Sequence, residues 1–453
     1  MKRHLAAAAA AGIVTMFGIT GVASASTVQT GSIVLDNSNI SAPHKIVYDS
    51  TTYMPIWYVM RTLDKLNIQS VWNGSEWQLT TASTAPVNLA NIHPGTGNVS
   101  IYVNDILVQK VASIVAVDPA SGQKTTYMPI WYVMQILNRL GVYSNWNGWK
   151  WNMESPAVQV LANAFMNTEK APYSQFTGDI HELVQIQPST TTIQPGVTPQ
   201  NGNSSSGSSG SAMPTQMTID MKIQSQSGIV NNQRAMLITI TPTITPLPGS
   251  TGTSGQPSGT GPVALPSTIH IYIQGTQVWM NQGQGWQALP QSQALLQKIQ
   301  SQIPGSQINL ASLKNIQSTA TPSGYTYTAQ LNPAGIAGVL GPIMQSVASQ
   351  ASSASHVSPA QIQAILTTIL SHMAGSMTID VQTSTGQPLV TEEQMQMSMD
   401  LPLSQLFSMG SLGGSMAQAS DIKVNESMSV SYTYNSTPLT PPTGLPQNSA
   451  SMP

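Results

Sequence analysis

The chain has 453 residues, enough for about two or three domains, and its formal net charge is only −2. Charged residues make up 7% of it, against roughly 25% in an average globular protein, so it lacks the basic surface that nucleic-acid binding requires. Cysteine is absent, which excludes disulfide bonds, thiolate metal sites and a lipid-modified cysteine anchor.

The first residues have the pattern of a secretory signal peptide. Basic Lys2-Arg3 is followed by an apolar, Ala-rich run up to Val22 and then by the small residues Ala23-Ser24-Ala25. We predict that residues 1–25 are removed and that the mature chain is secreted or extracytoplasmic; attachment to the cell surface stays open. The alternative is an uncleaved membrane anchor. No later apolar run is long enough to cross a bilayer, so no stable span is expected after cleavage.

A duplicated stretch follows. Residues 51–60 read Thr-Thr-Tyr-Met-Pro-Ile-Trp-Tyr-Val-Met, and residues 125–134 repeat them. The match continues in register, so that Trp-Asn-Gly stands at both 72–74 and 146–148. A repeat of this kind predicts one structural unit per copy. Each copy is expected to contain a strand, a helix and a β-hairpin, with a leading strand at 101–108 in the second copy.

Local signals place the ends of these elements. Proline suits the first helical position, and apolar residues then recur at helical spacing, with Asn67 and Gly141 at positions that accept a left-handed C-cap. Asn-Gly between two tryptophans predicts a two-residue type I′ turn with a positive φ at Gly74 and Gly148. The helical apolar residues are Ile56, Val59, Met60, Leu63 and Leu66, and in the second copy Ile130, Val133, Met134, Leu137 and Leu140.

The Tyr-Met-Pro-Ile segment, the Leu-rich helix and the Trp-Asn-Gly hairpin resemble the copper amine oxidase-like N-terminal module, or stalk domain, of exported bacterial proteins. The resemblance covers residues 26–155 and implies an extracellular appendage, not the oxidase. Family members often carry Arg and Glu around the helix, and these positions are largely uncharged here. An oxidase would need clustered histidines, but His44, His93, His181, His270, His356 and His372 are scattered.

Tryptophans concentrate in this module. They could form a stacking platform for a glycan or cell-wall polymer, but equivalent tryptophans in two copies are more simply explained as core residues. Trp149 is the exception, because its counterpart is Ser75, and it is the ring we expect to be exposed.

Residues 156–437 have a different pattern. A short helix from Pro156 is followed by β-prone segments in which apolar and polar residues alternate, which is typical of antiparallel strands with one buried face. Two apolar helices, 333–350 and 359–374, interrupt the strands, and Gly375 is the expected cap of the second. Segments 188–216 and 247–265 are expected to be disordered insertions, and 438–453 a disordered tail. The fold class is therefore α+β: a small tandem αβ module, then a curved antiparallel half-barrel with two covering helices.

A long antiparallel sheet interrupted by two helices is similar to the lipoprotein-carrier architecture of LolA and LppX. The similarity rests on the hairpin at 271–286, the Gly-Tyr-Thr-Tyr-Thr strand at 324–328 and the closing strand at 430–434. It implies that a lipid or other apolar ligand lies between the sheet and the helices. The candidate cavity residues lie on the two helices and on one strand, and they are Leu340, Leu366, Ile369, Met395, Met397 and Met399.

The same residues also suggest other chemistry. The three methionines could bind Cu(I) through their thioethers, but Leu401 and Leu403 continue the same face, so a core or cavity-lining stripe is the simpler interpretation. The adjacent pair Glu392-Glu393 is interpreted as a solvated turn. Nucleophile elbows, phosphate loops and zinc-protease helices do not occur, so we expect neither enzyme activity nor a cofactor.

Three functions follow as hypotheses. The first is a non-catalytic secreted surface protein whose stalk module presents a domain that binds a lipid-like apolar ligand. The second is a structural or adhesive envelope protein whose half-barrel is filled by its own side chains. The third is an extracytoplasmic copper-handling protein. The low content of acidic groups further suggests tolerance of acid, since acid denaturation comes mostly from carboxylates that protonate on unfolding.

Overall fold

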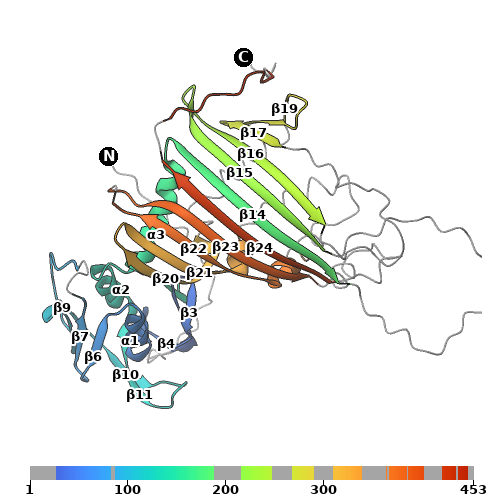
Figure 1. Cartoon of the computed structure of the whole chain (residues 1–453). Helices are drawn as coiled ribbons and strands as arrows, with labels where there is room; N and C mark the ends of the chain where they lie inside the picture. The colour runs from blue at the N-terminus through green and yellow to red at the C-terminus, as the bar shows by residue number, and fades with distance from the viewer. Residues whose placement is uncertain are drawn as a thin grey trace, which may run out of the picture. The chain divides into compact units, whose positions relative to one another are not determined.

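The structure is a computed structural model, and it describes residues 27–82, 87–187, 216–246, 268–289, 310–338, 364, 367–384, 386–401, 421–434 and 437–446 (Figure 1). It is mostly β, with few helices. The chain forms two compact units: Met1–Leu35 with Asn39–Met153, and Asp36–Ser38 with Glu154–Pro453. The expected signal peptide and nearly all of the two expected insertions lie outside the described residues.

The first unit contains three sheets. One sheet has the strand order β1 (Thr27–Thr30), β4 (His44–Tyr48), β5 (Thr51–Pro55), β11 (Lys124–Pro129) and β10 (Ile114–Val117). Another has the order β12 (Tyr143–Trp146), β13 (Lys150–Glu154), β2 (Ser32–Leu35) and β3 (Ser38–Ser41). The third has the order β6 (Gln69–Trp72), β7 (Glu76–Thr80), β8 (Val99–Val103) and β9 (Ile106–Val111).

The two copies of the repeat interlock, which corrects the expectation of one separate unit per copy. β5 pairs antiparallel with β11 so that Met54 lies opposite Met128, its own counterpart in the repeat. The last hairpin of each copy is extended by the leading hairpin of the other, through the parallel pairs β7–β8 and β13–β2. A single copy would leave the edges of β7 and β13 unpaired, and unpaired strand edges are unfavourable when buried.

The equivalent helices α1 (Ile56–Lys65) and α2 (Ile130–Arg139) bury the predicted apolar stripe. Pro55 and Pro129 end the preceding strands and occupy the N-cap, one position earlier than expected. The predicted C-caps are confirmed: Asn67 and Gly141 have φ of 55° and 74°. The residue after each cap closes the helix: Ile68 donates its backbone N–H to the carbonyl of Leu63 (3.1 Å), and Val142 donates to that of Leu137 (2.9 Å), as in a Schellman motif.

The tryptophan hairpins have positive φ at Gly74 (106°) and Gly148 (96°), as predicted, but the turn type differs. Three residues, not two, connect β6 to β7 and β12 to β13. The reason is the side chain of the preceding asparagine. Asn73 Oδ1 accepts the backbone N–H of Glu76 at 2.7 Å, and Asn147 Oδ1 accepts that of Lys150 at 2.8 Å. This side-chain bond favours a wider turn than the backbone alone would form.

One core joins both copies. Trp77 and Trp151 are fully buried in it, and each indole N–H donates to a serine hydroxyl, Ser70 at 2.7 Å and Ser144 at 2.6 Å. The core interpretation is therefore right for these two rings. It is wrong for Trp57 and Trp131, which are exposed on α1 and α2 because they lie opposite the buried stripe.

The second unit is built on an eleven-stranded antiparallel sheet (Figure 1). Its first and last strands, β14 and β24, pair in the middle of the sheet. On one side of this pair, the order is β15, β16, β17, β18 and β19, and on the other it is β23, β22, β21 and β20. The bounds are β14 Ser174–Gln187, β15 Gln216–Val230, β16 Gln233–Pro246, β17 Ile269–Gln274, β18 Gln277–Asn281, β19 Trp286–Ala288, β20 Leu313–Thr321, β21 Gly324–Leu331, β22 Met373–Gln382, β23 Leu389–Leu401 and β24 Asp421–Thr433.

Alternation along the strands gives this sheet two different faces. On the apolar face, a row of side chains crosses five strands, comprising Met377, Met395, Met428, Ile180 and Met221. On the polar face, the adjacent row comprises Thr378, Gln394, Ser429, Asp179 and Lys222. The period-two pattern in the sequence therefore predicts the faces correctly.

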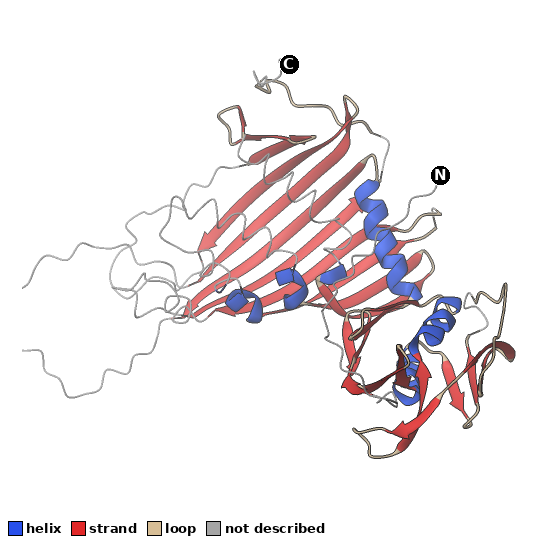
Figure 2. Ribbon diagram, turned by 180° about the vertical axis from the view of Figure 1, so that it is seen from behind, coloured by secondary structure: helices blue, strands red, loops and turns tan. Residues whose placement is uncertain are grey.

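Helix α3 (Pro156–Lys170) lies along the apolar face, as seen from behind in Figure 2. Its Leu161, Ala164 and Phe165 pack in one core with residues of β20 to β23. Hydrogen bonds fix its two ends: Tyr327 Oη donates to the carbonyl of Ala157 (2.8 Å), and the hydroxyls of Thr168 and Tyr434 are 2.8 Å apart.

Two expectations about this unit need correction. The helix expected at 359–374 ends by Ser371, and β22 begins at Met373. Gly375 is therefore a strand residue and not a cap: a Cβ there would lie 2.5 Å from the carbonyl oxygen of Gln396, so the close approach of β23 requires glycine. Of the helix expected at 333–350, residues 333–338 are described and helical.

The second correction is that the start of the expected disordered tail is ordered. Leu439, near its start, is buried at the far end of the sheet with Val230, Tyr272 and Trp279. At this point the chain packs closely on β15, since a Cβ added to Gly228 would lie 2.7 Å from the Cβ of Leu439. An apolar contact of this kind orders the segment in spite of its proline-rich composition.

Candidate functional site

A cavity of about 220 Å³ lies on the apolar face of the second unit. Its walls come from α3, from β20 to β23 and from the helical turn after β21. The side chains are almost all apolar, with one carboxyl group among them. The described lining residues are Phe165, Ser312, Leu313, Leu331, Ile336, Met373, Met377, Glu393, Met395 and Met397.

The predicted site residues are partly brought together here. Met395 and Met397 line the cavity, whereas Met399 and Ile369 are not among its described lining residues. Leu340 and Leu366 lie outside the described residues. The six candidate cavity residues do not include Met373 and Met377, of which Met377 lies directly opposite Met395. The sequence pattern predicts a strand at 377–381, but residue types alone do not reveal that this strand is the neighbour of β23.

Methionine dominates this wall for a physical reason. An unbranched thioether side chain can adopt several shapes at little cost, so a methionine wall adapts to guests of different outline. Met377, Met395 and Met397 are partly buried, in contrast to fully buried Ile379 and Val390 in the core beside them. The wall is therefore both apolar and accessible.

The spacing of the methionines argues against a Cu(I) site formed by Met395, Met397 and Met399. Residues two apart on one strand are separated by about 6.8 Å along the strand, so Met395, Met397 and Met399 form a row and do not converge on one point. Neighbouring strands lie only about 4.8 Å apart. The backbones of Met377 and Met395, which are opposite each other on adjacent strands, are therefore closer together than those of Met395 and Met397. Among the residues that the structure describes, no three His, Cys, Asp or Glu side chains are grouped as metal ligands.

Glu393 is the polar group in this apolar wall. It belongs to strand β23 and not to a solvated turn, which corrects the interpretation of the Glu392-Glu393 pair. The two side chains point to opposite faces, because they are adjacent on a strand. Tyr432 on β24 donates a hydrogen bond to the Glu393 carboxyl, yet burial dominates and raises the pKa of Glu393 to about 7. Glu393 stands two residues before Met395 and four before Met397, and residues at such spacings on a strand point to the same face. This spacing is visible in the sequence.

Two more carboxyl groups share this face further along the sheet. Glu426 lies opposite Met397 on one side and opposite Glu182 on the other. Burial, and then the negative charge of Glu182, raise the pKa of Glu426. The part of the apolar face near the cavity therefore carries acidic groups, and the described residues that line the cavity include no lysine, arginine or histidine.

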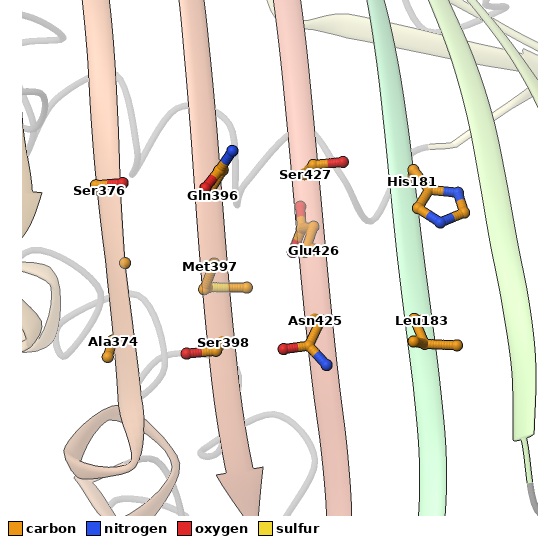
Figure 3. Close-up of a pocket in the computed structure, with 11 residues that line it drawn as sticks. His181, Leu183, Ala374, Ser376, Gln396, Met397, Ser398, Asn425, Glu426 and Ser427 are labelled. Atoms are coloured by element: carbon orange, nitrogen blue, oxygen red, sulfur yellow. The ribbon is translucent and has the colours of Figure 1, made fainter.

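The opposite face of the same strands has a wider, shallower hollow of about 500 Å³ (Figure 3). Ser376, Gln396, Ser427 and His181 form one row across it, with Ala374, Ser398, Asn425 and Leu183 in the next. His181 Nδ1 lies 2.6 Å from a carboxylate oxygen of Asp220, but both side chains are half exposed. Small polar side chains in contact with solvent make this a solvated surface, which cannot enclose an apolar guest.

Exposed tryptophans on the first unit are the alternative binding surface. Trp149 is exposed, as predicted, together with Trp57 and Trp131. Two of these rings are already engaged. The Lys45 ammonium lies 4.3 Å from the ring centre of Trp149, and the Arg61 guanidinium lies 5.7 Å from that of Trp57. Internal cation–π contacts explain part of the exposed aromatic surface without a glycan.

The sequence matches no protein-family model, and no curated protein matches it. Within the described part of the chain, no helix has the length and apolar character to cross a membrane.

Proposed function

We propose that this chain is a non-catalytic, secreted or cell-surface protein whose second unit binds the aliphatic part of a lipid-like ligand. In this proposal the duplicated stalk-like unit carries the binding unit outside the cell, and the ligand enters between α3 and the apolar face of the sheet. The resemblances to stalk modules and to lipoprotein carriers are part of the proposal.

The observation that supports it is the cavity lined by Phe165, Leu331, Met377, Met395 and Met397. At about 220 Å³ it is smaller than the roughly 300–1,000 Å³ typical of sites that enclose a whole small molecule. It can accommodate a segment of an alkyl chain. Each methylene that leaves water for such a wall contributes about 0.8 kcal/mol, so a few of them already give measurable affinity.

The direct test is binding of an uncharged long-chain fluorescent lipid probe to the full secreted protein. Saturable binding is expected, and Met397→Gln should weaken it about tenfold, because a polar amide then replaces apolar wall. Ser398→Gln is the matched control: it places the same new side chain on the next residue of β23, facing the polar side. It should leave the affinity unchanged.

Two results would contradict the proposal. Absence of saturable binding, or equal losses in the two variants, would favour a structural protein whose apolar face is filled by its own side chains. Stoichiometric Cu(I) uptake that blocks the probe would favour the methionines as metal ligands. Thermal melts of both variants show whether the fold is retained.

A further inference from the structure

On strands β14, β22, β23 and β24, the charged side chains of the apolar face are all acidic. Glu393 lines the cavity itself, and Glu426 and Glu182 follow on the same face. The lysines of β24 and β20 point to the other side: Lys423 lies opposite Asp400, and Lys314 lies opposite Gln330. The ion pair between Lys423 and Asp400 (3.6 Å) lies on the polar face. A negatively charged ligand would therefore meet carboxylates at the cavity and find no cation among the described residues that line it.

Within the described part of the chain, the Glu393 carboxyl also has unused hydrogen-bonding capacity. An ionised carboxylate has about four acceptor positions, and Tyr432 supplies one donor to it. The surrounding methionines and leucines supply none. A partly buried carboxyl group with free acceptor positions gains from a ligand that brings a donor, since leaving such groups unpaired in an apolar site is costly.

Resting on the function proposed above, we infer that the cavity selects amphiphiles whose head group donates hydrogen bonds and is not anionic, such as long-chain amines and alcohols, with Glu393 as the specificity-determining residue. The alkyl chain contacts the methionine wall, and the head group lies at Glu393 and Tyr432. Fatty-acid anions of equal chain length are discriminated against, because like charges at short range in a poorly solvated site repel each other strongly.

The experiment compares dodecylamine, dodecanol and dodecanoate as competitors of the uncharged fluorescent probe, on the full protein at about pH 8, where Glu393 is mostly ionised. The amine is expected to compete at least about tenfold more tightly than the acid, which corresponds to about 1.4 kcal/mol, with the alcohol between them. In Glu393→Gln the difference between amine and acid should shrink to about threefold or less. Glu392→Gln removes the same charge on the polar face and should preserve the preference.

The outcomes separate this inference from the proposed function. If the probe binds but dodecanoate competes as well as dodecylamine, or if the two glutamine variants change the preference equally, the head-group selectivity is wrong and apolar binding stands. If the probe does not bind at all, both fail. Glu393→Gln keeps the size of the side chain and removes a partly buried charge, so thermal melting should show a fold at least as stable as the parent.

Discussion

The two units use apolar residues in opposite ways. In the duplicated unit the largest side chains are sealed: Trp77 and Trp151 have no exposed surface, and their indole N–H groups are bonded internally. In the sheet unit, Met377, Met395 and Met397 remain partly exposed beside a cavity. The core of the first unit packs two equivalent halves around the β5–β11 pair and leaves little room for a guest. The broad sheet of the second unit is covered by α3 on part of its apolar face, and beside α3 it leaves such room.

The largest expected effect is on the sealed core. Trp151→Ala should lower the free energy of unfolding of the first unit by about 3–5 kcal/mol, since a fully buried ring is lost and a cavity remains. Met397→Ala in the sheet should cost only about 1–2 kcal/mol, because its side chain is already partly exposed. Denaturant unfolding, followed separately for the two units, measures both. Equal losses would remove the contrast between a sealed core and an open face.

The repeat allows a matched pair of turn variants. Gly74→Val and Gly148→Val should each destabilise the first unit by about 1–3 kcal/mol, because valine is strained at positive φ. Apart from the glycine and its two chain neighbours, no described atom lies within 4 Å of the position of either added Cβ, so the loss is conformational and should be equal in both copies. Thermal melting of the two variants tests this, and wild-type midpoints in both would disprove the shared turn geometry.

The carboxyl groups of the sheet unit predict an unusual pH dependence. Burial raises the pKa of Glu393 from 4.5 to about 7 and that of Asp36 to about 6. At a pH between the ordinary pKa of such a carboxyl group and its raised pKa, the folded protein binds a proton at this group that the unfolded chain does not bind. Stability should therefore rise as pH falls from about 8 to about 5, by about 1–3 kcal/mol for each group.

The melting midpoint of the sheet unit measured across this range checks the sign. Glu393→Gln should flatten the profile, and Glu392→Gln should not. A midpoint that falls steadily from neutral pH to pH 5 would contradict the assignment, and with it the acid tolerance expected from the composition.

The smallest effect on the free energy of unfolding is expected at Trp149, the exposed tryptophan whose counterpart in the first copy is Ser75. Trp149→Ala should cost less than about 1 kcal/mol, since the ring is 63% exposed and loses mainly its cation–π contact with Lys45. Denaturant unfolding beside Trp151→Ala, two residues away, gives the comparison. A loss as large as that of Trp151→Ala would show that the lysine contact is a structural element of this unit.

Local patterns in the sequence were enough to predict the helices α1 and α2, their left-handed caps and the alternation of most strands. These features depend on neighbours within a few residues, so the sequence contains the information. The interlocking of the two copies depends on which strand edges meet, as in the pairs β7–β8 and β13–β2, and residue types alone do not specify that.

The candidate site shows the same limit. Met395, Met397 and Glu393 share a face by parity, which can be seen from the sequence. Met373 and Phe165 join them only through the order of strands and the placement of α3. Gly375 was mistaken for a helix cap because its real constraint, the carbonyl of Gln396, is distant in the chain.

The central claim is that an alkyl chain binds at the methionine wall of the sheet and nowhere in the sealed core. Methyl NMR of the full protein tests it most directly, with ¹³C-labelled methionine, single Met→Leu variants for assignment and dodecylamine as the titrant. The ε-methyl signals of Met373, Met377, Met395 and Met397 should shift saturably, while those of buried Met54, Met128 and Met153 stay fixed. Shifts confined to the buried set, or no shift at a saturating concentration of amine, would contradict the claim.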